Sequence, residues 1–251
     1  MKVTLLQTDI LLNEPTANML MAEKMIMDAE KSDLYVLPEM FATGFITIPF
    51  EGADADGKTL AWLKQMARKY DAAFACSVAV KEKDEEFYNR FYFVKPDGKV
   101  TKYDKRHLFS YGGEGKYYHQ GEDCVTVEWC GVRFLLQICY DLRFPVFSRN
   151  NKEEHYDAAI YVANWPESRR KPWDILLRAR AIENQCYVIA VNRVGDDNMC
   201  HYNGGSAIID AYGNDVVTLE DNVHGTASAV LDMEVLQRFR KKFPVLNDAD
   251  K

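Results

Sequence analysis

Short apolar runs alternate with amphipathic stretches along most of the 251-residue chain. Runs that are continuously apolar, or in which apolar and polar residues alternate, are typical of β-strands. The expected strands are residues 3–10, 34–37, 74–80, 87–94, 100–105, 125–129, 132–138, 158–163, 187–192, 206–210, 216–219 and 226–231. Several of these runs are apolar at almost every position, which predicts strands covered on both faces.

Helical spacing of apolar residues lies between several of these strands. The first such stretch begins at Pro15, a residue favoured in the first turn of a helix. The expected helices are residues 15–29, 60–70, 145–151, 172–184 and 235–243. Strands and helices interleave, but some strands follow each other through tight turns. The pattern therefore predicts an α/β fold with a mixed sheet, helices on one face and a second sheet behind it. We expect one domain over residues 1–246 and a C-terminal tail, 247–251.

Composition and charge argue against several classes of function. The net charge is −7 at pH 7, and basic clusters are limited to Arg169-Arg170-Lys171 and residues 238–242. Nucleic-acid binding is therefore not expected. The apolar run after Met1 is too short for a signal peptide, and no stretch is long enough to span a membrane. The six cysteines form no CxxC pair and no zinc-ligand spacing, which predicts reduced thiols in a cytoplasmic protein.

Cys139 lies where an apolar strand gives way to a polar turn. It follows the expected strand 132–138, and Pro145 then suggests the start of a helix. A side chain at such a turn projects from the sheet edge beside free backbone N–H groups, which stabilise a thiolate or a substrate oxyanion. Cys139 is thus a candidate nucleophile. The alternative is a small buried hydrophobe, the usual role of a free cysteine.

Two charged residues also end buried strands. Glu39 follows the strand 34–37, where a carboxylate needs a partner and is placed to act as a general base. Lys105 ends the strand 100–105, where an ammonium would stabilise a thiolate and the charge on a carbonyl oxygen. The alternatives are a glutamate that reaches water and a solvated basic strand edge.

The glycine-rich loop 108–121 contains a second candidate carboxylate, Glu114. Long loops inside compact domains usually have a function, so Glu114 is interpreted as positioning Lys105 or the substrate, or else as a solvated loop charge. His107 raises the alternative of a Cys–His pair. It has no evident Asn or Asp partner in the sequence, and we interpret it as structural.

Three motifs together resemble those of the nitrilase (carbon–nitrogen hydrolase) superfamily. They are Leu37-Pro38-Glu39-Met40-Phe41, Lys105-Arg106-His107-Leu108-Phe109 and Ile138-Cys139-Tyr140-Asp141-Leu142-Arg143-Phe144-Pro145, in the family's order Glu, Lys, Cys. The resemblance covers nearly the whole chain, including Asn164-Trp165-Pro166 and residues 179–184. Within the superfamily, the loops 41–45 and 109–114 are similar to those of the bacterial omega-amidase branch.

The resemblance implies a four-layer αββα sandwich of the nitrilase type that dimerises through its helix layers. It also implies a role for each motif residue: Glu39 as general base, Lys105 as oxyanion stabiliser, Cys139 as nucleophile, Glu114 as an additional carboxylate, the Tyr140 backbone N–H as second oxyanion donor, and Asp141 and Arg143 as residues that fix the turn.

By the same resemblance, the chain is an amidohydrolase for small carboxylate-bearing amides. It would convert a 2-oxo acid amide to a 2-oxo acid and ammonia through a cysteine thioester, with no metal or organic cofactor. Its partners would be the amide, water and further copies of the chain, in a homodimer or a higher homo-oligomer. The alternatives are a nitrile or carbamoyl hydrolase of the same superfamily, or a non-catalytic dimeric binding module. The complete set of Glu39, Lys105 and Cys139 argues against the binding module.

A substrate carboxylate needs an anchor, and the sequence offers Arg169 and Arg170. They follow Asn164-Trp165-Pro166, at the end of the strand next along the chain from Cys139. Parallel strands end at the same sheet edge, and an arginine there would hold a carboxylate by two parallel hydrogen bonds. Phe45 and Trp165 would wall the pocket. The alternative is that these arginines are solvated.

Overall fold

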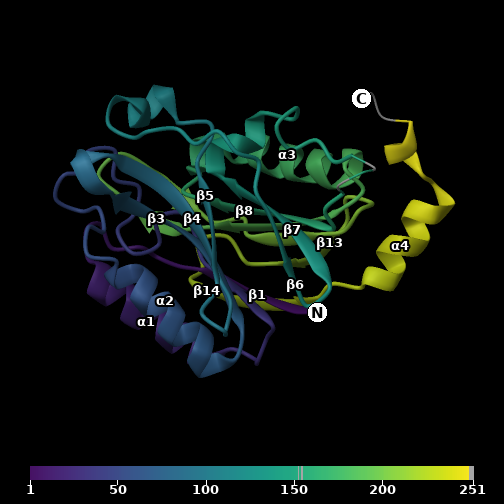
Figure 1. The fold of residues 1–251 in the computed structure, drawn as a ribbon, viewed down its shortest axis with the longest axis horizontal. Coiled ribbons are helices and arrows are strands. Elements are labelled where there is room, and N and C mark those ends of the chain that lie inside the picture. The colour runs from purple at the N-terminus through teal and green to yellow at the C-terminus, as the bar shows by residue number, and fades with distance from the viewer. Residues whose placement is uncertain (152, 154, 249–251) are drawn as a thin grey trace.

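Two six-stranded sheets lie face to face, with helices on the outer side of each and the last helix at one end of the molecule (Figure 1). The computed structural model describes residues 1–151, 153 and 155–248. The helices are α1 (Pro15–Asp28), α2 (Lys58–Tyr70), α3 (Arg170–Glu183) and α4 (Met233–Lys242). In the described part of the chain, no helix is long and apolar enough to cross a membrane.

The first sheet has the strand order β14-β1-β2-β3-β4-β5. Its strands are β1 (Lys2–Gln7), β2 (Leu34–Val36), β3 (Ala73–Lys81), β4 (Phe87–Val94), β5 (Val100–Asp104) and β14 (Gly225–Val230). Strands β1, β2 and β3 run parallel, and the other neighbours pair antiparallel. The sheet is thus mixed, as the sequence predicted.

The second sheet repeats this arrangement in the order β13-β12-β9-β8-β7-β6. Its strands are β6 (Thr126–Trp129), β7 (Val132–Ile138), β8 (Ala158–Ala163), β9 (Tyr187–Asn192), β12 (Ala207–Ile209) and β13 (Asp215–Thr218). Strands β7, β8 and β9 form its parallel centre, flanked by antiparallel strands. Each sheet therefore carries three parallel strands whose carboxyl ends are free to build a site.

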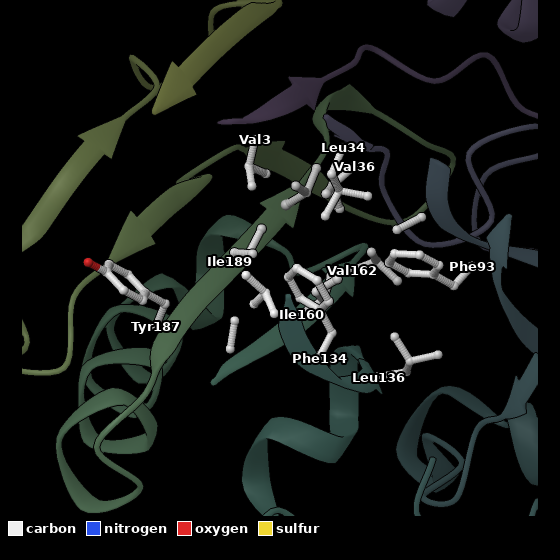
Figure 2. Packing of buried hydrophobic residues seen from close by; sticks show 14 of the residues in the cluster. Val3, Leu34, Val36, Phe93, Phe134, Leu136, Ile160, Val162, Tyr187 and Ile189 are labelled. Atoms are coloured by element: carbon white, nitrogen blue, oxygen red, sulfur yellow. The ribbon is translucent and has the colours of Figure 1, made fainter. Parts of the chain in front are cut away.

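The apolar residues of these strands separate into three layers. In β7, Phe134 and Leu136 face the first sheet, whereas Leu135 faces α3, because successive side chains point to opposite faces. The core between the sheets includes Phe93 of β4, whose ring centroid lies 5.8 Å from that of Phe134 (Figure 2). A separate core, which includes Phe74, lies beneath α1 and α2. The result is the αββα sandwich that the resemblance implied.

Most expected elements form within three residues of their predicted bounds, but the helix expected at 145–151 is wrong. A short 3-10 helix, Cys139–Arg143, follows β7 directly, and residues 145–151 form turns and irregular backbone. Asn150 accounts for part of the difference. Its side chain donates to the backbone oxygens of Tyr156 and Asn184, bonds that compete with helix formation.

Two further differences concern short segments. A two-stranded hairpin, β10 (Val194–Asp196) and β11 (His201–Asn203), was not predicted. Its strands are three residues each and largely polar, too short to show alternation. In the tail expected at 247–251, Asn247 ends the 3-10 helix Val245–Asn247, and residues 249–251 lie outside the described residues.

Candidate active site

Side chains from both sheets meet at one pocket of about 300 Å³. Glu39 follows β2 and Lys105 follows β5 in the first sheet, whereas Cys139 follows β7 in the second. The two sheets thus place a carboxylate and an ammonium opposite a thiol. Other expected site residues that line the pocket are Phe45, Tyr140, Trp165 and Arg169.

Lys105 is completely buried between two carboxylates. Its Nζ donates to Glu39 Oε1 at 2.9 Å and to Glu114 Oε2 and Oε1 at 2.9 and 3.1 Å. Burial alone would lower the pKa of Lys105, but the charges of Glu114 and Glu39 outweigh burial and raise that pKa above its ordinary value. Lys105 is therefore a permanent cation.

The glycine-rich loop brings Glu114 under the pocket. Gly113 has φ +80°, a left-handed conformation that suits glycine, and the 3-10 helix Glu114–Lys116 begins directly after it. Glu114 is fully buried, and its Oε2 also accepts from the Phe109 N–H at 2.6 Å. Burial raises the pKa of Glu114, while Lys105 opposes that change. Glu114 is not a solvated loop charge.

Cys139 occupies a strained turn. Its φ is +44°, a region that non-glycine residues rarely adopt, so the surroundings must hold it there. The buried carboxylate of Asp141 does so, because it accepts from the Ile138 N–H at 2.9 Å, the Tyr103 hydroxyl at 2.7 Å and the His107 N–H at 3.1 Å. Asp141 thus ties the turn to the segment that carries Lys105.

The surroundings of Cys139 favour its thiol over its thiolate. Burial raises its pKa well above the ordinary value, the charge of Glu39 adds to that effect, and Lys105 opposes it. The sequence suggested that free N–H groups would stabilise a thiolate, but burial and a neighbouring carboxylate prevail here. Attack by Cys139 therefore requires that its proton pass to a base, and Glu39 is the adjacent carboxylate.

Two buried asparagines hold Glu39, and neither was assigned a role from the sequence. The Asn164 N–H donates to Glu39 Oε2 at 2.8 Å, and its Nδ2 donates to the Glu39 backbone oxygen at 2.7 Å. Asn89 Nδ2 donates to Glu39 Oε1 at 2.8 Å. The signal for Asn164 was its place after a buried strand. Asn89 lies between the polar residues Tyr88 and Arg90 and gave no such signal.

His107 does not belong to the pocket. Its ring stacks on Phe144, with centroids 3.8 Å apart, and its Nδ1 lies 2.8 Å from Asp141 Oδ1. His107 therefore has an aspartate partner, 34 residues along the chain, that was not evident from the sequence. The pair supports the turn and is not a Cys–His arrangement.

The pocket walls carry two guanidinium groups with no carboxylate partner among the described residues. Arg143 lies 4.9 Å from the Trp165 ring centroid, and Arg169 lies 5.3 Å from that of Phe109. Arg143 was expected to fix the turn, but its side chain lines the pocket. Arg170 does not: it pairs with Asp174 and Asp221, each at 2.8 Å.

The unpredicted hairpin closes one side of the pocket. Its contributions are Asp197, Met199, Cys200 and Tyr202. Within residues 1–151, 153 and 155–248, no group of three or more His, Cys, Asp or Glu side chains is arranged to hold a metal ion.

Comparison with known proteins places the chain in a family. Residues 2–241 match the Carbon-nitrogen hydrolase family, so the chain belongs to that family, the nitrilase superfamily. It is 45% identical over 252 residues to an omega-amidase of Yersinia enterocolitica, YafV, with 100% of this chain and 97% of that protein covered.

Two further similarities extend this result. The chain is 34% identical over 253 residues to a 2-oxoglutaramate amidase of Bacillus subtilis, with 99% of this chain and 97% of that protein covered. Its fold matches a crystal structure from Xanthomonas campestris with a TM-score of 0.96 and 39% identity, covering 100% of this chain and 97% of the other. That structure is a CN-hydrolase superfamily protein with an arsenic adduct in its active site.

Proposed function

We propose that this chain is an omega-amidase, which hydrolyses the terminal amide of a small 2-oxo dicarboxylic acid monoamide such as 2-oxoglutaramate. The observation that carries the proposal is the pocket itself. Cys139, Glu39 and Lys105 line it together with two guanidinium groups that have no carboxylate partner in the described part of the chain. The relatives named omega-amidase and 2-oxoglutaramate amidase support the same substrate class.

In the proposed mechanism, Glu39 takes the thiol proton as Cys139 attacks the amide carbon. The charge then develops on the substrate oxygen, where Lys105 and the Tyr140 backbone N–H would stabilise it. Glu39 returns the proton to the leaving ammonia and then activates water, which hydrolyses the thioester. Glu114 is proposed to act through Lys105, since its oxygens accept two of the lysine's hydrogen bonds.

The substrate carboxylate is proposed to bind Arg143 or Arg169. Both line the pocket and both are held by an aromatic ring, which leaves their N–H groups free to bind an anion. Arg170 was an equal candidate from the sequence, but its two aspartate partners and its place outside the pocket argue against it.

The test measures ammonia released from 2-oxoglutaramate, from the nitrile and carbamoyl compounds of matching length, and from a neutral amide. We expect the acid-bearing amide to be preferred, and Cys139→Ala to abolish turnover while keeping the fold. Arg143→Ala and Arg169→Ala, assayed separately, should raise KM for the acid-bearing amide in at least one variant, with little change for the neutral amide. Arg170→Ala is the matched control. Preference for a nitrile, or no hydrolysis at all, would reject the proposal.

We also propose that the protein is a cytoplasmic homodimer. Apolar side chains on α3 are exposed, among them Ile175 and Ile182. Family resemblance suggests pairing through a helix layer, and all six cysteines are unpaired thiols. Ile182→Glu should give a monomer by analytical ultracentrifugation, whereas Leu20→Glu on α1 should not. An unchanged mass for Ile182→Glu would exclude pairing through α3.

A further inference from the structure

One buried amide contacts both carboxylates of the active site. Asn89 lies on β4 with no exposed surface, and its Nδ2 donates to Glu39 Oε1 at 2.8 Å and to Glu114 Oε1 at 3.0 Å. Its backbone oxygen accepts from the Lys105 N–H at 3.0 Å. A single residue thus contacts both carboxylates and the backbone of the lysine that lies between them.

The orientation of this amide is fixed from both ends. Nδ2 faces only carboxylate oxygens, which accept and do not donate when ionised. On the other side, the buried Ser77 Oγ accepts from the Met40 N–H at 2.9 Å and therefore donates its own hydrogen to Asn89 Oδ1, at 2.8 Å. A flipped amide would set Oδ1 against two carboxylates. Ser77 and Met40 thus hold Asn89 with both of its N–H bonds aimed at Glu39 and Glu114.

Two buried carboxylates at such close quarters have a strong tendency to share one proton. That proton would lie between Glu39 and Glu114 and would make Glu39 useless as a base. In this structure, Oε1 of Glu39 and Oε1 of Glu114 each accept hydrogen bonds from both Asn89 and Lys105. Lys105 supplies charge, but it is a single group shared by two acids.

We propose that Asn89 is a positioning residue that keeps Glu39 and Glu114 as two separate acceptors and leaves Glu39 Oε2 as the oxygen that receives the Cys139 proton. Oε2 accepts from the Asn164 N–H, while Oε1 accepts from both Asn89 and Lys105. The ionisable groups that face this cluster are Lys105, Cys139 and Tyr118, each from a different segment of the chain.

The inference rests on the proposed role of Glu39 as the base, so its test uses a reaction of Cys139 in which no amide bond is hydrolysed. Iodoacetamide alkylation of Cys139, followed by mass spectrometry across pH, reports the proton transfer from the thiol. Asn89→Leu removes two hydrogen-bond donors from the carboxylates and so disfavours ionised Glu39. The acidic limb of the plot of alkylation rate against pH should therefore move to higher pH by about one unit. Asn89→Asp keeps the size of the side chain, adds a third carboxyl group and should shift the limb at least as far.

Two controls separate positioning from simple loss of packing. Asn150→Leu removes another buried amide whose Nδ2 also donates to two oxygens. Asn150 does not line the pocket, so this variant should leave the acidic limb at its wild-type pH. Ser77→Ala keeps Asn89 but frees its amide to turn, and should move the limb in the same direction by less. Circular dichroism and thermal unfolding show which variants are folded.

The outcomes are distinct. A uniform loss of rate at every pH in Asn89→Asp, with the limb unmoved, would overturn the proposal, and so would an equal shift in Asn150→Leu. If the shift is found but the wild-type protein releases no ammonia from 2-oxoglutaramate, the substrate assignment fails and the role of Asn89 stands. If ammonia release is normal and the limb does not move, only the role of Asn89 fails.

Discussion

Charge balance at Cys139 explains why its thiol keeps its proton. One ammonium, Lys105, faces the two carboxylates Glu39 and Glu114, so the ionised cluster already carries one net negative charge. A thiolate would add a second in a buried site, which is costly. In the proposed mechanism, transfer of the proton to Glu39 during attack leaves the net charge of the cluster and substrate unchanged. The new negative charge would then lie on the substrate oxygen, where Lys105 is proposed to stabilise it.

This balance predicts opposite shifts for two variants that both lose turnover. Lys105→Met removes the cation that opposes the rise in the Cys139 pKa, so that pKa should go higher still and the alkaline limb of alkylation should move to higher pH. Glu39→Gln removes a negative charge that raises the pKa of Cys139, so its limb should move to lower pH. Iodoacetamide titration measures both. Shifts of the same sign would contradict the proposed arrangement.

At the scale of single elements, the turn after β7 depends on one carboxylate. Asp141 is fully buried and accepts three hydrogen bonds from two segments, one through Ile138 and the other through Tyr103 and His107. Without it, several buried donors would lose their partner, and the positive φ of Cys139 would lose its support. Asp141 therefore joins β7, the turn after it and the segment that carries Lys105 through hydrogen bonds.

We expect Asp141→Ala to lower the free energy of unfolding by about 3 kcal/mol, because each buried donor left unsatisfied costs about 1–3 kcal/mol. Cys139 should also lose its selective reactivity toward iodoacetamide. Urea unfolding measures the first effect, and Asp123→Ala, at an exposed position, is the control. A loss below about 1 kcal/mol in the free energy of unfolding, close to that of an ordinary surface change, would show that the turn does not depend on Asp141 for its stability.

The same scale shows what the sequence could reveal. Strands such as β7 and β8 are buried on both faces, so their apolar runs are continuous and their bounds were predicted correctly. The helix expected after Pro145 was wrong in part because the side chain of Asn150 donates hydrogen bonds to backbone oxygens outside this segment. The role of Asn89 was invisible for a related reason: it depends on partners from other strands, and no local pattern records which polar residue of an apolar strand faces a site.

The candidate site residues show the same contrast between local features, which the sequence reveals, and distant partners, which it does not. Glu39, Lys105 and Cys139 each end a buried strand, a local feature, and the structure brings them to one pocket. Arg169 and Arg170 are adjacent in the chain and equivalent by sequence, yet only the former lines the pocket. Arg170 instead pairs with Asp174 and Asp221. Asp221 lies 51 residues along the chain, so no local pattern reveals this pairing.

At the scale of the whole molecule, the two halves of the proposed reaction come from different sheets. The base candidate and its supports, Glu39, Asn89 and Lys105, belong to the first sheet, whereas Cys139 and Asn164 follow strands of the second. The distance between nucleophile and base is therefore set by the packing of one sheet on the other. Reacting groups must be held within a fraction of an ångström, so the core between the sheets contributes to the geometry of the site as well as to stability.

Two phenylalanine truncations separate these contributions. Phe134→Ala removes a ring that packs between the sheets (Figure 2). Phe74→Ala removes one from the core beneath α1 and α2. Each should lower the free energy of unfolding by about 3–5 kcal/mol, measured by urea titration. At equal fractions folded, only Phe134→Ala should slow both ammonia release and Cys139 alkylation, since only it changes the spacing of the sheets. Equal losses of activity in the two variants would mean that the strand ends alone set the distance from Glu39 to Cys139.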